Sequence, residues 1–276
     1  MLNQYSRNIL GRFLSLYQSS DQISIAILSE IILFTCGINR VLRLVVEPNF
    51  SNEIKRTLFN ENLYFSSGKL YEVIKDNGWS SISNKPIDNK MHTKVLLVLG
   101  NELSDVEDCY KNELKGDFRT SGKYFNYPDC CINSYPAISS SQDQWANTLI
   151  ENSGPGPYPC WANRLATGWG GACFSGELFP CSLHCQNAIA IGKKTYNCLL
   201  DIGFKKLSRE FLQQSLNPLI VHKNGKIEKV LDSLNINTKL YTFEAFKDIY
   251  DKISLSSDKN YQFFVSFGGY DDGKSF

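Results

Sequence analysis

The sequence predicts a mixed fold, α/β to α+β, with an N-terminal α/β lobe over residues 1–117 and a cysteine- and loop-rich α+β lobe over residues 118–276. Two observations lead to this prediction. Apolar segments with the periods of strands and helices alternate through the first part, a pattern typical of α/β lobes. From Phe118 to Gly176 the chain is instead rich in Gly, Pro, Ser, Asn and aromatic residues. The alternative is that both parts belong to one continuous domain.

The first part is expected to contain a buried helix followed by apolar strands. Residues 22–35 are apolar on most helical faces, and Gly37 is a natural helix stop. Residues 41–46, VLRLVV, and 94–99, KVLLVL, have the apolar, β-branched composition of strands. Further elements are expected at residues 51–59 (helix), 63–65 (strand) and 104–114 (helix).

The second part is expected to combine long loops with helices and a hairpin. The prolines of residues 153–159, SGPGPYP, withhold amide donors, so this segment is a loop. A long helix is predicted from Cys181 to about Leu200. Asn224 and Gly225 favour a type I′ turn between two strands. The other elements are predicted at 130–135, 142–151, 161–166, 204–216 and 242–253 (helices), 219–230 (hairpin) and 261–267 (strand).

Composition and charge disfavour several classes of protein. The 276 residues are 42% hydrophobic and 21% charged, which is the profile of a globular protein. The formal net charge of +1 argues against a dedicated nucleic-acid binder, because such proteins carry a strong basic excess. No secretory signal opens the chain, and Glu30, Arg40 and Arg43 interrupt its most apolar stretch, residues 23–46. We therefore expect a soluble, cytoplasmic protein with no membrane partner.

The cysteines are concentrated in one stretch of the chain. Of the 9 cysteines, most fall between residues 130 and 185. Structural disulfides are rare in a reducing compartment, so clustered cysteines there indicate metal binding or catalysis. Cys36, Cys109 and Cys198 lie outside the stretch on expected helices, and we interpret them as small buried hydrophobic residues.

The segment FPCSLHC, residues 179–185, is the first candidate for a functional site. Cys181 and Cys185 are four residues apart, which places them on one face of the expected helix. Pro180 fits the residue just before a helix, so Cys181 would lie in the first turn, where the helix dipole lowers the pKa of a thiol. His184 is a candidate further ligand or proton donor.

The segment YPDCC, residues 127–131, is the second candidate. Asp129 fits the start of a helix, as a cap or a first-turn acid. Adjacent side chains point about 100° apart on a helix, so we expect one of Cys130 and Cys131 to face the site and the other to pack. Cys160 and Cys173, in the loop-rich stretch, are additional candidate ligands.

Four cysteine ligands fit either of two cofactors. A tetrahedral zinc ion and an iron–sulfur cluster both take four ligands, commonly all cysteine. The usual pair of CxxC zinc motifs is absent from this sequence, whereas iron–sulfur clusters tolerate more varied spacings. The candidate metal and cofactor ligands are Cys130, Cys131, Cys181 and Cys185. We predict that Cys181, Cys185 and at least one of the other two meet in space.

The two cysteine motifs together resemble a prokaryotic family of unknown function that carries a GYPxCC segment and a downstream HxPCSxxC segment. The similarity covers roughly residues 125–230 and includes the hairpin PLIVHKNGKIEKV. The sequence departs from the family pattern in two places. Asn126 replaces the glycine, and Leu178 stands where the family has histidine. This chain therefore lacks the histidine that any histidine-dependent reaction of the family would use. The resemblance implies a shared site and no particular reaction.

The leading functional hypothesis is a metal- or iron–sulfur-dependent enzyme of small-molecule metabolism. Cys181, His184 and Arg164 are its candidate catalytic residues, with Arg164 placed to grip a carboxylate or phosphate. The first alternative is a binding or scaffold protein in which the cysteines only stabilise the loop-rich lobe. The second is a metal-free thiol enzyme that uses Cys181 as its nucleophile. A small molecule is the expected partner, and the reaction and oligomeric state stay open.

Overall fold

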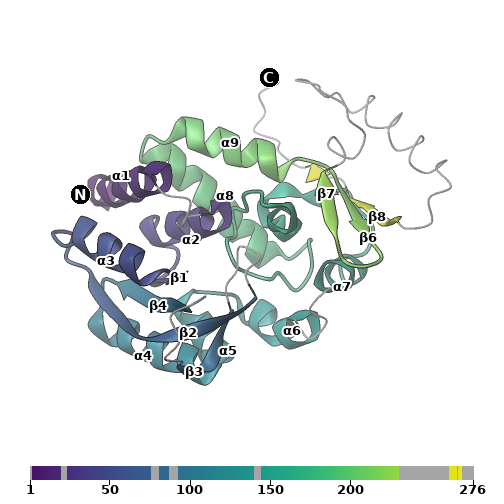
Figure 1. Ribbon diagram of the computed structural model, residues 1–276. Helices are drawn as coiled ribbons and strands as arrows, with labels where there is room; N and C mark the ends of the chain where they lie inside the picture. The colour runs from purple at the N-terminus through teal and green to yellow at the C-terminus, as the bar shows by residue number, and fades with distance from the viewer. Residues whose placement is uncertain are drawn as a thin grey trace.

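The computed structural model describes residues 2–19, 24–75, 81–86, 93–139, 144–229, 261–265 and 267–268, and it confirms the predicted mixed α/β or α+β fold (Figure 1). Its helices are α1 (Leu2–Ser19), α2 (Ile25–Thr35), α3 (Pro48–Thr57), α4 (Leu103–Lys115), α5 (Phe118–Tyr124), α6 (Asp129–Ser139), α7 (Trp145–Glu151), η1 (Cys160–Ala162, 3-10), η2 (Arg164–Trp169, 3-10), α8 (Gln186–Asp201) and α9 (Lys205–Ser215). Its strands are β1 (Val41–Val46), β2 (Tyr64–Lys75), β3 (Ser81–Pro86), β4 (Thr93–Gly100), β5 (Tyr158–Pro159), β6 (Leu219–His222), β7 (Ile227–Lys229), β8 (Tyr261–Val265) and β9 (Phe267–Gly268).

A sheet with the strand order β1–β4–β2–β3 forms the centre of the N-terminal part. All of its pairings are antiparallel, and β1 and β4 align Leu42 with Leu99 and Leu44 with Leu97. These leucines pack with α1, α2 and α3, while Leu96 and Val98 of β4 pack on the other face with α4. The strand β4 is therefore covered on both faces, which explains its continuous apolar sequence.

Helix α1 is an element that the sequence interpretation did not assign. Its residues Ile9, Leu10, Phe13 and Leu16 follow the spacing of one helical face and are buried. The same helix is largely polar on its other face, and none of the described helices is long and apolar enough to cross a bilayer.

The largest hydrophobic core joins the N-terminal elements to helices much later in the chain. Residues of α1, α2, β1 and β4 share it with residues of η1, α8 and α9. Gly192 lets α8 approach η1 closely, because a Cβ at this position would stand 2.0 Å from the carbonyl oxygen of Trp161. The division into two lobes at residue 117 stays a prediction. Whether the chain forms two lobes or one continuous domain, residues from both sides of position 117 share this core.

The C-terminal part carries the predicted hairpin and a second small sheet. β6 pairs antiparallel with β7 and with β8, and the turn between β6 and β7 contains Gly225 at a φ of 81°. Figure 1 shows this sheet at the far end of the molecule from α1 and α3. The helix predicted at residues 242–253 lies outside the described residues.

Cys36 and Cys198 form a disulfide that joins the end of α2 to α8, with a Cα–Cα distance of 6.0 Å. The interpretation of these two residues as separate buried hydrophobic side chains is wrong. The two lie 162 positions apart in the sequence, so only the packing of α2 on α8 reveals the pair.

Candidate metal centre

Four cysteine thiols meet at one point of the structure. Cys130 and Cys131 lie in the first turn of α6, and Cys181 and Cys185 lie in the loop that leads into α8. All four sulfur atoms lie within 4.8 Å of one another. The Sγ–Sγ distances are 3.8 Å from Cys130 to Cys131, 3.8 Å from Cys130 to Cys185 and 3.6 Å from Cys131 to Cys185. These four residues, here called the thiol cluster, could bind a metal ion.

Both cysteines of the YPDCC segment belong to the thiol cluster, so the prediction that one of them packs away is wrong. α6 begins at Asp129, and the amides of Cys131 and Ile132 both donate to the carbonyl of Pro128 at 2.9 Å. Side chains in a first turn lean back past the start of the helix, because each Cα–Cβ bond tilts toward the N-terminus. A point just beyond the end of α6 is therefore within reach of both Cys130 and Cys131.

The downstream motif forms a turn rather than the start of a helix. α8 begins at Gln186 with Cys185 as its N-cap, so the predicted helix start at Cys181 is wrong. The Cys185 amide donates to the Ser182 carbonyl at 3.0 Å, and the His184 amide donates to Oγ of Ser182 at 3.1 Å. A serine that bonds to nearby backbone competes with the helical pattern. This turn, and not a shared helix face, brings the two cysteines together.

Buried residues anchor the turn on both sides. Leu183 is fully buried, and its amide donates to Oγ of Ser153 at 2.7 Å. Just ahead of the turn, the ring of Phe179 meets that of Trp145 edge-on at 5.4 Å. The guanidinium of Arg164 stacks on Phe179 with its carbon 4.3 Å from the ring centroid, within the range of a cation–π interaction. The candidate catalytic Arg164 is thus buried beneath the loop.

The four thiols differ in their access to solvent. Cys131 is 1% exposed and Cys185 is 8% exposed, whereas Cys181 is partly exposed and Cys130 is exposed. Asn187, in the first turn of α8, donates from Nδ2 to Sγ of Cys130 at 3.6 Å. One side of the thiol cluster therefore faces solvent through Cys130, and the opposite side is closed by the core.

The thiols of the cluster have unequal affinities for protons. Burial raises the pKa of Cys131 well above its ordinary value and raises the pKa of Cys181 to about 12. Burial also acts to raise the pKa of Cys130, but hydrogen bonds from Asn187 and from the neighbouring thiols outweigh it and leave that pKa lowered. Thiols bind metal as thiolates, so a bound ion must displace the protons that the buried thiols hold.

The other predicted site residues contribute no side chain to the group of four thiols. The ring of His184 packs against Tyr158, and its Nε2 lies 3.1 Å from the carbonyl oxygen of Pro155. Cys160 is buried in the core beside α8, and Sγ of Cys173 lies 3.1 Å from a serine hydroxyl. The structure brings none of His184, Cys160 and Cys173 into the group of four thiols. Their proposed roles stay predictions.

A buried acidic residue supports the loop that leads to the thiol cluster. Glu30 of α2 is 3% exposed and accepts hydrogen bonds from the amide of Glu177 and from Nδ2 of Asn39. Burial, and next the charge of Glu177, raises the pKa of Glu30 to about 8. A Cβ on Gly176, which has a φ of +61°, would collide with Glu30. In the sequence, this contact is marked by Glu30, the acidic residue of a largely apolar helix.

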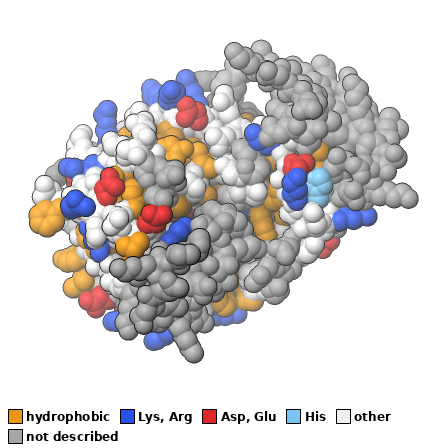
Figure 2. Space-filling model, in the orientation of Figure 1, with side chains coloured by type: hydrophobic (Ala, Val, Ile, Leu, Met, Phe, Trp, Pro, Cys, Tyr) orange, Lys and Arg blue, Asp and Glu red, His pale blue; other side chains and the backbone are white. Residues whose placement is uncertain are grey.

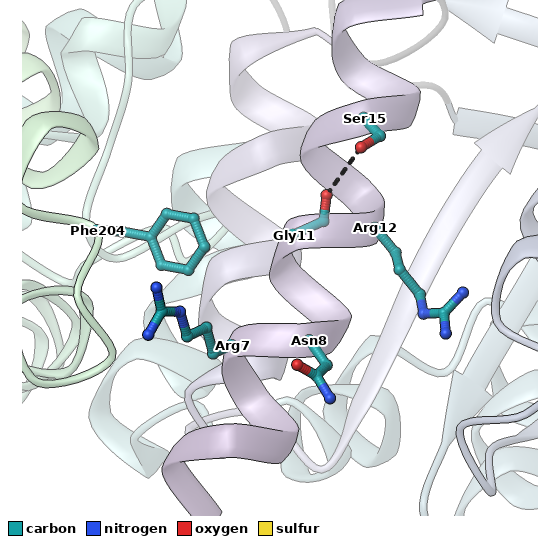
Figure 3. Close-up of a pocket in the computed structure, with 6 residues that line it drawn as sticks. All are labelled: Arg7, Asn8, Gly11, Arg12, Ser15 and Phe204. Carbon is teal, nitrogen blue, oxygen red and sulfur yellow. Dashed lines mark hydrogen bonds between the residues drawn. The ribbon is translucent and has the colours of Figure 1, made fainter.

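Outside the thiol cluster, the surface carries a groove along α1 of about 500 Å³ (Figure 3). In Figure 3, Arg7 lies beside Phe204 on one side of α1, and Arg12 points the other way. Arg12 is engaged by Glu61, with 2.6 Å between Nε and Oε1. On the face shown in Figure 2, basic and acidic side chains are interspersed among hydrophobic and polar ones. The groove contains no cysteine and shares no residue with the thiol cluster.

No protein-family model, no curated protein and no solved structure matches this chain. The thiol cluster is therefore interpreted from its own geometry.

Proposed function

We propose that this chain is a zinc protein in which the thiol cluster holds one ion through four thiolates. The spacing of the sulfur atoms carries the proposal. Four thiolates at about 2.3 Å around a tetrahedral ion place their sulfur atoms about 3.8 Å apart. The distances between the sulfurs of Cys130, Cys131 and Cys185 are 3.6–3.8 Å. The spacing of these three sulfurs thus matches a single tetrahedral ion, and the fourth sulfur, that of Cys181, lies within 4.8 Å of them.

The same spacing favours one ion over the iron–sulfur cluster that the sequence left open. In a [4Fe–4S] cluster each thiolate binds a different iron, so the ligand sulfurs lie further apart than on a single ion. Zinc is preferred because four cysteine thiolates form its common closed site. Mononuclear iron would fit the same geometry, and its colour and metal content distinguish it.

The number of ligands favours a structural ion over a catalytic one. Catalytic zinc sites keep an open position for water or substrate, whereas structural sites are closed by four protein ligands. Here the ion would join the start of α6 to the loop before α8, two segments more than 40 residues apart in the sequence. The amino ends of both helices point toward the cluster, and their dipoles stabilise negative charge on the thiolates. The enzymatic role predicted from sequence stays a prediction.

Metal analysis of the purified full chain tests this proposal. We expect about one zinc per chain, no visible colour, and loss of the zinc on replacing Cys131 with Ser. Cys109→Ser is the matched control, because Cys109 is also a buried free thiol but lies outside the thiol cluster. A brown protein with several irons per chain, or a chain that binds no metal after anaerobic purification, would contradict it.

A further inference from the structure

The thiol cluster is buried on the side of Cys131 and Cys185 and most exposed to solvent at Cys130. Cys131 and Cys185 are 1% and 8% exposed, whereas Cys130 is exposed to solvent at the start of α6. Asn187 donates a hydrogen bond to the sulfur of Cys130. Among the described residues, it is the one residue outside the cluster that does so. A reagent approaching from solvent therefore meets the sulfur of Cys130 first.

Bound thiolates remain nucleophilic, and access decides which of them reacts. Cysteine oxidation follows thiolate character and exposure and is favoured where a second thiol stands nearby. In a zinc site all four sulfurs are thiolates, so exposure becomes the property that distinguishes them. Cys130 combines exposure with two neighbouring sulfurs at 3.8 Å.

We propose that Cys130 is a modification site at which hydroperoxides oxidise the cluster and release its ion; this inference rests on the proposed zinc site. The Cys130 thiolate attacks one peroxide oxygen, the O–O bond breaks, and the other oxygen leaves with the bonding pair and is protonated to water or alcohol. The product is a sulfenic acid on Cys130. A second cluster thiolate then attacks that sulfur, a disulfide forms, and hydroxide leaves and is protonated. The two sulfurs lose two electrons, which the peroxide has accepted.

Cys185 is the favoured partner for the second step, because its sulfur lies 3.8 Å from that of Cys130, whereas Cys181 is placed only within 4.8 Å of the other sulfurs. Cys131 lies equally near Cys130, at 3.8 Å between sulfurs, but it is the adjacent residue. Consecutive Cα atoms are about 3.8 Å apart, which is shorter than the 4.4–6.8 Å usual for a disulfide. Cys185 lies on a separate segment, at the start of α8. The Cys130–Cys185 disulfide would leave zinc with two ligands, Cys131 and Cys181, and the ion would dissociate.

The test uses the zinc-loaded full chain, titrated with hydrogen peroxide while a zinc-binding dye follows release of the ion. We expect peroxide-dependent loss of the zinc, a new Cys130–Cys185 disulfide in peptide mass spectra, and recovery of binding after reduction. Cys130→His removes the exposed thiol from the cluster, so peroxide should form no disulfide to Cys185 in this variant. Asn187→Ala removes the hydrogen bond to Cys130 and should speed release about two- to fivefold.

The outcomes separate the two proposals. A chain that binds no zinc overturns the zinc site and this inference with it. A chain that binds zinc but keeps it in peroxide, or in which peroxide modifies a cysteine outside the cluster first, overturns only the inference. Mapping the oxidised residues in the native sequence requires no variant, so the inference stays testable if Cys130→His does not fold.

Discussion

Helix α8 has cysteines near both of its ends, and the two ends use them differently. At its amino end, Cys185 joins three other thiols with sulfurs 3.6–3.8 Å apart in the contacts measured. Near its carboxyl end, Cys198 is covalently bonded to Cys36 of the α2 cap. The number of thiols that the fold brings together decides the chemistry. Two thiols can close a disulfide, whereas four thiols held apart leave room for an ion.

The thiol cluster and the disulfide at the two ends of α8 also differ in how clearly the sequence indicates them. The thiol cluster is assembled from two short motifs, each with closely spaced cysteines. The disulfide joins two cysteines that stand alone in their helices. In this chain the dense motifs mark the candidate metal ligands, whereas the crosslink between Cys36 and Cys198 depends on helix packing.

Removing the ion is expected to have the largest effect. Chelation should lower the free energy of unfolding by about 4 kcal/mol or more, because a tightly bound ion stabilises only the native state. Cys131→Ala should reproduce the loss. Urea unfolding with and without chelator measures both effects.

Cys109→Ala provides the matched control for that measurement. Cys109 is as deeply buried as Cys131, at 0% against 1% exposure, but lies in α4 outside the thiol cluster. Its removal should cost about 1 kcal/mol, and the chelator should have the same effect on this variant as on the native chain. Equal losses of unfolding free energy in Cys109→Ala and Cys131→Ala, with no effect of the chelator, would mean that the cluster thiols stabilise the chain no more than a buried thiol elsewhere.

Breaking the crosslink is expected to have the second largest effect. The double variant Cys36→Ser with Cys198→Ser should lose about 3 kcal/mol of stability, because a disulfide restricts the unfolded chain. The zinc content should stay unchanged, since neither residue belongs to the thiol cluster. The measurement is urea unfolding with and without a reductant, which should destabilise the native chain and leave the variant unaffected. Free thiols at both positions in the oxidised native chain would sink this prediction.

Glu30 connects the two regions, because it lies in α2, whose cap is Cys36, and holds the loop that leads to the thiol cluster. Its pKa is raised to about 8 by burial and by the charge of Glu177, while Arg43 and Arg164 act in the opposite direction. The native state therefore binds the Glu30 proton more tightly than the unfolded state. This stabilising contribution is complete below the ordinary glutamate pKa of 4.5 and is lost as the pH rises through about 8.

The Glu30→Gln variant tests this dependence. In the native chain, Glu30 should lower the free energy of unfolding by at most about 1.4 kcal/mol per pH unit between pH 5 and 8. Glu30→Gln should have a flatter profile over that range, whereas Glu53→Gln, at an exposed position of α3, should follow the native profile. Thermal unfolding across the pH range measures all three. A native profile as flat as that of Glu30→Gln would count against the raised pKa.

The smallest effect is expected from the turn that positions Cys181 and Cys185. Oγ of Ser182 accepts a hydrogen bond from the His184 amide at 3.1 Å, so Ser182→Ala should loosen the turn and weaken zinc binding about fivefold, or about 1 kcal/mol. Competition with a chelator of known affinity measures the change. Ser15→Ala, in α1, is the control and should leave the affinity unaltered. Unchanged affinity in Ser182→Ala would mean that the buried Leu183 alone sets the turn.

Local sequence signals were sufficient to predict the apolar strands and the general place of the site. The run KVLLVL forms a strand covered on both faces, and the two cysteine motifs meet in space. Local signals were insufficient where a tertiary contact or a competing hydrogen bond decides the conformation. The side chain of Ser182 accepts a hydrogen bond within a turn, so α8 begins at Gln186 and not at the predicted Cys181.

The remaining differences have similar physical causes. Cys130 and Cys131 both reach one point because side chains in a first helical turn lean past the end of the helix. The prediction considered only the angle of about 100° between adjacent side chains. The Cys36–Cys198 pair depends on the packing of α2 against α8, which no local pattern encodes. Asn187 reaches Cys130 from the first turn of another helix, and no sequence motif indicates this contact.

X-ray absorption at the zinc edge of the purified full chain tests the central claim most directly, because it reports the identity, number and distance of the atoms around the ion. We expect four sulfur neighbours at about 2.3 Å and no metal neighbour. Replacing Cys131 with Ser should reduce the number of sulfur neighbours or abolish binding. Nitrogen or oxygen atoms in the ligand set of the native chain, or a neighbouring metal atom that indicates a cluster, would contradict the account.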